Sequence, residues 1–161
     1  MTQFTRKSVR AGSAMQIAGI DRDKFNAYVA DGYFNCAPPA RNRASRVFEY
    51  GDLIALCVFA DLLAFGFKPR EAGRFACIIR QRDLYTKDRV VIVRGHRISE
   101  VFLPEEFDAN TTHIPALGDI LSYTVLRLDT VSRRVLNAIR EIEETAIIGD
   151  DDDAPGAGGG V

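Results

Sequence analysis

The segment from residue 14 to residue 32 constrains the fold more than any other part of this chain. Apolar residues at helical spacing predict a short helix over 14–18 and a second helix over 22–30, with a turn at Gly19 and Ile20. Asp21 stands where its carboxylate can accept hydrogen bonds from the free amides of the second helix. Gly32 can adopt the left-handed conformation that ends that helix. In such a pair, one helix buries its apolar face and the other can point its first turn into the major groove of DNA.

The second helix of this pair has an apolar and a polar side. Phe25 and Val29 are predicted to point inward, with Tyr28 beside them. Arginine and lysine can bond guanine acceptors or phosphate, and asparagine can bond adenine. The alternative is an ordinary solvated helix face. The candidate DNA contacts on this helix are Arg22, Lys24, Asn26 and Tyr28.

A basic loop follows the second helix and favours the DNA interpretation. Arg41, Arg43 and Arg46 fall within six residues, and no acidic residue separates them. Val47 and Phe48 are expected to form a short strand that returns from a hairpin. A basic hairpin beside a recognition helix can hold the phosphate backbone, which positions the protein on the duplex. The three arginines are therefore predicted backbone contacts.

The order of these features resembles the DNA-binding domain of the MerR family over residues 13–82. The matching stretches are Gly19-Ile20-Asp21, Gly32-Tyr33-Phe34, Ser45-Arg46-Val47-Phe48 and Phe65-Gly66-Phe67, followed by a helix that opens at Lys68-Pro69-Arg70-Glu71-Ala72. The resemblance implies a winged helix-turn-helix and carries DNA contact over to Arg46. Ser45 replaces the family tyrosine that meets a phosphate, so that contact is not carried over. Glu49 stands where the family has a serine-type cap.

The charge distribution agrees with a DNA-binding first half. The formal net charge is −1, but residues 1–94 hold 16 Lys/Arg and 9 Asp/Glu, a balance of +7. Residues 95–161 hold 5 Arg and 13 Asp/Glu, a balance of −8. Such asymmetry within a chain is a recognised signal of nucleic-acid interaction. The positive half coincides with the predicted helices and wing, where phosphate attraction would act.

Composition sets the expected compartment. Hydrophobic residues make up 47% of the chain, which can fill a core, and no apolar run approaches the ~20 residues that span a bilayer. No secretory signal is apparent. Cys36, Cys57 and Cys77 have neither zinc-site spacing nor a disulfide pattern. We therefore expect Cys57 and Cys77 to be buried apolar side chains. The expected location is the reducing cytoplasm, in association with the nucleoid.

The remaining segments are predicted to be a scaffold, a hairpin, a long helix and a tail. Helices over 52–65 and 69–82 close the small core, and strands over 89–94 and 98–103 form a hairpin. From residue 116 to 148, apolar positions at alternating steps of four and three predict one long helix that pairs with a second chain. A helix buried in its own monomer is the alternative. The expected dimer interface is Leu117, Leu121, Leu128, Val131, Val135, Ala138 and Ile142.

These predictions give a mainly α fold with a small β component, a winged helix-turn-helix followed by a β-hairpin and a long C-terminal helix. The predicted divisions are a flexible arm (1–12), the DNA-binding domain (13–82), the hairpin and loop (83–115), the long helix (116–148) and a disordered acidic, glycine-rich tail (149–161).

The predicted function is that of a homodimeric, sequence-specific transcriptional regulator. Double-stranded DNA is the expected partner, with RNA polymerase or another protein as a further candidate and no membrane. An excisionase-like DNA-bending factor and a protein-interaction adaptor are the alternatives. Enzymatic activity is not expected, because His96 and His113 stand alone and no phosphate-binding loop is present. No cofactor or metal is expected.

Overall fold

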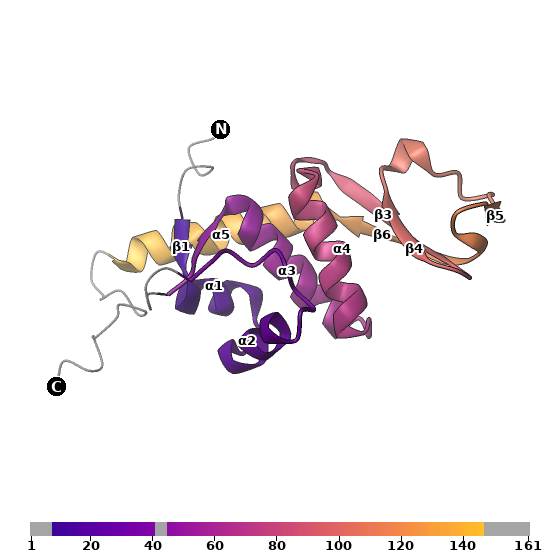
Figure 1. The fold of residues 1–161 in the computed structure, drawn as a ribbon. Helices are drawn as coiled ribbons and strands as arrows, with labels where there is room; N and C mark the ends of the chain where they lie inside the picture. The colour runs from indigo at the N-terminus through magenta and orange to yellow at the C-terminus, as the bar shows by residue number, and fades with distance from the viewer. Residues whose placement is uncertain (1–7, 41–44, 147–161) are drawn as a thin grey trace.

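The computed structural model describes residues 8–40 and 45–146. Helices take 51% and strands 22% of this part, so the protein is a mixed α/β protein with an antiparallel sheet. The helices form a body, and the sheet extends from one end of that body, away from the second helix (Figure 1). Arg41 and Arg43, the tail over 149–161 and residues 1–7 of the predicted arm lie outside the described residues.

The helical body begins with four helices and a two-stranded ribbon, and the fifth described helix joins it after the sheet. Two of its helices, α2 and α4, begin where the sequence predicted, and α1 begins three residues earlier than predicted. Asp21 caps α2 as expected, because its carboxylate accepts a hydrogen bond from Lys24 N at 3.0 Å. The elements are β1 (Ser8–Arg10), α1 (Ala11–Ala18), α2 (Arg22–Ala30), β2 (Val47–Glu49), α3 (Tyr50–Ala64) and α4 (Pro69–Gln81).

The first strand corrects two predictions about the chain's beginning. β2 pairs antiparallel with β1, with Val9 opposite Phe48, and does not pair within the basic loop among the described residues. The prediction of a flexible arm is therefore wrong for residues 8–12. Val9 and Phe48 are both buried, so the pairing is held by the core. A three-residue strand is too short to show an alternating pattern in the sequence.

Glu49 takes part in the cap at the start of α3. Glu49 and Asp52 form a reciprocal capping box, in which Glu49 N donates to Asp52 Oδ2 at 2.9 Å. Arg80 of α4 donates from Nε to Asp52 Oδ1 at 2.8 Å. A buried carboxylate needs such partners to offset its lost hydration. The cap therefore also joins α3 to α4.

The sheet has four strands in the order β4-β3-β6-β5, all antiparallel. One face carries Val90, Ile92, Val101 and Leu126 and belongs to the main core with the helices. The other face holds a smaller apolar cluster around Val93. The predicted hairpin is confirmed as β3 and β4. The strands are β3 (Arg89–Gly95), β4 (Ser99–Phe102), β5 (His113–Ile114) and β6 (Gly118–Arg127), and short 3-10 turns cover Leu84–Thr86 and Pro104–Glu106.

The predicted long helix is wrong over residues 118–127, which form β6. α5 (Leu128–Ala146) begins only after that strand. Gly118 has a left-handed φ of 83° at the start of the strand. Leu121, Tyr123 and Val125 lie two residues apart, which is the spacing of one face of a strand. Tyr123, Thr124 and Val125 are residue types that favour strands.

The predicted coiled-coil seam belongs to the chain's own core. Leu117 is buried beneath the sheet, whereas Leu121 lies exposed on β6. The α5 side chains Leu128, Val131 and Val135 are at most 4% exposed, and α5 packs on α1 and α3. Ala138 and Ile142 are half-buried on the same helix. Leu128, Val131 and Val135 therefore fit the alternative of a helix buried in its own monomer, whereas Leu121 does not belong to that core.

Polar contacts also hold α5 against the body. Arg134 donates to Asp61 of α3 at 2.9 Å, and the Tyr50 hydroxyl bonds Ser132. None of the helices in the described ranges is long and apolar enough to cross a membrane.

Candidate nucleic-acid interface

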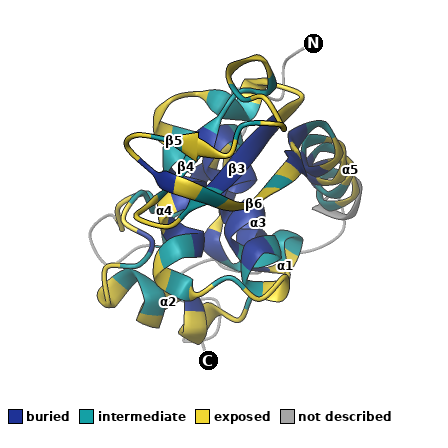
Figure 2. Ribbon diagram, turned by 90° about the vertical axis from the view of Figure 1, so that its right-hand side faces the viewer, coloured by how far each residue is buried: buried dark blue, intermediate teal, exposed yellow. Residues whose placement is uncertain are grey.

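The helix α2 lies at the margin of the body, and most of its surface is exposed or half-buried (Figure 2). Phe25 is its one buried residue, at 1% exposure, and its ring packs edge-on against Phe34 at 5.5 Å between centroids. Tyr28 packs edge-on against Phe59 of α3 at 5.4 Å. The Tyr28 ring therefore serves the packing of α2, and we leave it out of the proposed DNA contacts.

Three of the sequence-predicted contacts meet on one surface. Arg22, Asn26 and Arg46 line a small pocket of about 190 Å³ between α2 and the loop that precedes β2. Arg22 donates to Ser45 Oγ at 3.1 Å, and Arg46 donates to Pro38 O at 2.5 Å. Each guanidinium has five N–H donors, so these bonds position the side chains without using every donor in the described part of the chain. Lys24 is exposed on α2 but does not line the pocket.

The chain just after α2 is held against α4 by an unusually close contact. A Cβ atom added to Gly73 would stand 1.7 Å from Tyr33 O, so only glycine allows this approach. The guanidinium of Arg70 lies over the Tyr33 ring, 5.3 Å from its centroid. The position of α2 therefore depends on α4 as well as on its own core residue Phe25.

A disulfide between Cys36 and Cys77 joins the same two segments, which corrects the expectation that the cysteines form no disulfide pattern. Their Cα atoms are 5.4 Å apart, and the bond spans 41 residues of sequence. Sequence spacing alone could not show that α4 folds back onto the loop after α2. The disulfide and the Gly73–Tyr33 contact thus both hold the loop after α2 against α4.

Cys57 remains a free, buried thiol, as expected. Burial raises the pKa of Cys57 to about 11, although Arg134 opposes the shift. Since the thiolate is the reactive form, native Cys57 should resist iodoacetamide at pH 8 and react after unfolding. Mass spectrometry of alkylated peptides measures this, and rapid alkylation of the native protein would contradict the buried position.

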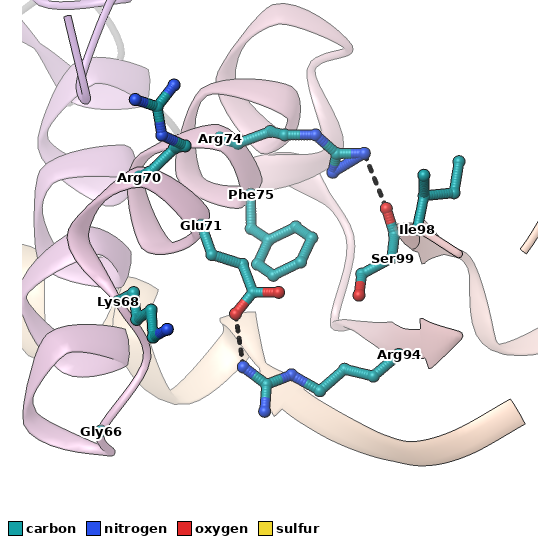
Figure 3. A pocket seen from close by; sticks show the side chains of 9 residues that line it. All are labelled: Gly66, Lys68, Arg70, Glu71, Arg74, Phe75, Arg94, Ile98 and Ser99. Atoms are coloured by element: carbon teal, nitrogen blue, oxygen red, sulfur yellow. Dashed lines mark hydrogen bonds and ion pairs between the residues drawn. The ribbon is translucent and has the colours of Figure 1, made fainter. Parts of the chain in front are cut away.

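A second basic surface surrounds the first turn of α4, where the sequence predicted only scaffold. A groove of about 560 Å³ lies between α4 and the β3–β4 hairpin. Figure 3 shows the side chains that line it. Its lining residues are Gly66, Lys68, Arg70, Glu71, Arg74, Phe75, Arg94, Ile98 and Ser99.

Two of the arginines in this groove hold the sheet to α4. Arg94 forms an ion pair with Glu71, and its guanidinium lies 4.3 Å from the centroid of the Phe67 ring. Arg74 donates to Ser99 O at 2.7 Å. Lys68 and Arg70 are exposed and form no ion pair with a carboxylate in the described part of the chain.

Lys68 and Arg70 are the candidate site residues that sequence reasoning missed. A signal was present, because Lys68, Arg70 and Arg74 alternate with the apolar positions of α4 and form its solvent side. Arg70 contacts the loop after α2 through the Tyr33 ring.

The sequence matches no known family model, and no curated protein is significantly similar to it. The functional interpretation therefore depends on the geometry of the site.

Proposed function

We propose that this chain is a sequence-specific DNA-binding regulator of the winged helix-turn-helix kind, with α2 as the recognition helix. The observation that carries the proposal is the convergence of exposed Arg22 and Asn26 with half-buried Arg46 on one small pocket beside the capped start of α2. A capped helix that bears an exposed arginine in its first turn and an exposed asparagine in its second suits the edges of guanine and adenine.

The basic residues around this surface have separate roles in the proposal. Arg22 and Asn26 contact base edges, and Lys24 contacts a base or an adjacent phosphate. Arg46 contacts the phosphate backbone, as do Lys68 and Arg70 from the start of α4. Backbone contacts fix the register of a protein on DNA, whereas base contacts determine sequence preference.

The decisive experiment selects DNA fragments from a random pool with the purified full chain and sequences them. Recovery of a defined motif supports the proposal. If no motif is enriched and binding to random DNA is also absent, the proposal fails. Binding without any sequence preference supports the architectural alternative.

Alanine variants then separate the two kinds of contact. Arg22→Ala should lose about 1–3 kcal/mol of binding on the selected site and much less on random DNA, because it removes a base contact. Arg46→Ala and Arg70→Ala should weaken binding to both, and each should lower the slope of log K against log salt by about 1. Fluorescence anisotropy over a salt series measures all three.

Arg89→Ala is the matched control, since Arg89 is an exposed arginine on the sheet and not on the proposed interface. It should leave affinity and salt slope unchanged. Equal losses for Arg22→Ala on selected and random DNA would contradict its assignment to bases. If neither Arg46→Ala nor Arg70→Ala changes DNA affinity or salt slope, the assignment of these residues to phosphate contacts is wrong.

A further inference from the structure

The strand β6 has one long edge without a strand beside it. β5 pairs only with Gly118 and Asp119, and Thr112 O accepts a hydrogen bond from Ile120 N at 2.9 Å. Beyond that point, β6 has a strand neighbour only on the β3 side within the described ranges. An edge of this kind exposes unpaired backbone groups that can template another strand.

The hairpin geometry shows which backbone groups face this open edge. Gly95 N donates to Ile98 O across the β3–β4 turn, so the backbone groups of Gly95 point toward β4. Backbone groups of successive residues point to opposite sides of a strand, so those of Arg94 and Ile92 point toward β6. Their partners Ser122 and Thr124 face back toward β3. The residues between and after them, Tyr123 and Val125, therefore direct their N–H and C=O groups outward.

The side chains along the same edge are apolar and exposed. Leu121, Tyr123 and Val125 are 67%, 46% and 47% exposed. They are three of the five large apolar side chains exposed in the described part of the chain. β6 contains neither proline nor lysine, which proteins commonly place on strands to prevent edge pairing. Its register shift opposite Arg94 and Gly95 lies before the regular stretch from Ser122 to Arg127.

The segment is also complementary to itself. In an antiparallel pair related by a two-fold axis at Thr124, Tyr123 of each copy lies opposite Val125 of the other. The outward backbone groups of these two residues would then bond each other. Arg127 of one copy would lie opposite Leu121 of the other, next to the register shift of β6 between Ile120 and Ser122. Within one chain Arg127 pairs with Asp129, and Asp119, beyond the shift, pairs with His113, so an Arg127–Asp119 contact across the axis would exchange these partners.

We infer that β6 is a dimerisation edge, on which β6 of a second copy of this chain adds antiparallel to make a continuous sheet. A self-complementary edge gives a closed two-fold dimer, which is the commonest form of homo-oligomer. This interface replaces the helical seam that the sequence suggested. It supplies the proposed regulator with its second DNA-binding module, but its test contains no DNA and is independent of the proposed function.

The test is sedimentation velocity of the full chain over a concentration series. Wild type should dimerise, and Tyr123→Lys should raise the dimer dissociation constant at least tenfold by placing like charges on the edge. Ser122→Lys is the matched control, because Ser122 is exposed on the same strand but its backbone groups face β3. A wild type that stays monomeric at every concentration, or a dimer that Tyr123→Lys leaves unchanged, overturns the inference.

Cysteine cross-linking tests the two-fold axis directly. Thr124→Cys should form an intermolecular disulfide on mild oxidation, since residues directly opposite each other in a non-hydrogen-bonded pair have Cα atoms about 4.5 Å apart, within disulfide range. Ser122→Cys should not cross-link, because its own copy would stand several residues away. If the Ser122→Cys variant cross-links and the Thr124→Cys variant does not, the proposed register is wrong. Circular dichroism confirms folding of each variant.

Discussion

Gly73→Ala should lower the free energy of unfolding by about 3 kcal/mol, at the upper end of the usual cost of overpacking a core. The added methyl would meet the carbonyl oxygen of Tyr33 at 1.7 Å, and a backbone atom cannot rotate away as a side chain can. Either α4 or the loop after α2 must shift. Urea denaturation followed by circular dichroism measures the loss.

Gly51→Ala is the matched control for this variant. Gly51 is also buried in a helix, but its added Cβ would meet side-chain atoms of Tyr85 and Arg80 at 2.9–3.0 Å. Those atoms can move, and alanine favours a helix over glycine by about 1 kcal/mol. The net effect at Gly51 should therefore be much smaller. Equal losses at the two glycines would contradict the special role of the Tyr33 contact.

Reduction of the Cys36–Cys77 bond should cost the protein about 4 kcal/mol of stability, from the chain entropy released when a loop of some forty residues opens. The bond spans 41 residues and joins the loop after α2 to the middle of α4. Urea denaturation with and without dithiothreitol should show the midpoint falling on reduction. Intact mass of the alkylated, unreduced chain should show one accessible thiol after unfolding.

The double variant Cys36→Ser/Cys77→Ser provides the control for the reductant itself. Its stability should match that of the reduced wild type and should not respond to dithiothreitol. If the wild type also fails to respond and three thiols alkylate without reductant, the disulfide does not form in the protein as purified.

The parts of the fold that the sequence predicted are those with strong local signals. Asp21 and Gly32 mark the limits of α2, and Pro69 marks the start of α4, because capping and φ restriction act within a few residues. The β-branched run of β3 followed by the turn at 95–98 likewise gave the hairpin. Each signal operates without knowledge of the tertiary structure.

The features that could not be predicted all depend on contacts distant in sequence. The apolar spacing of four and three residues continues into α5, so the sequence predicted a helix where β6 forms. Val9 of β1 pairs with Phe48, which lies 39 residues away. The disulfide and the Gly73–Tyr33 contact require α4 to fold back onto the loop after α2. Of the predicted DNA contacts, the meeting of Arg22 and Asn26 with Arg46 likewise appears only in three dimensions.

The direct passage from β6 into α5 has a mechanical consequence. Arg127 ends the strand and Leu128 begins the helix, with no linker between them, and Leu128 is fully buried. In the proposed dimer, the central sheet and the two helical bodies would therefore move as one rigid unit, with a fixed distance between the two copies of α2. The spacing between half-sites on DNA would be a fixed property of this fold, and inserting base pairs between them should abolish cooperative binding by the two copies.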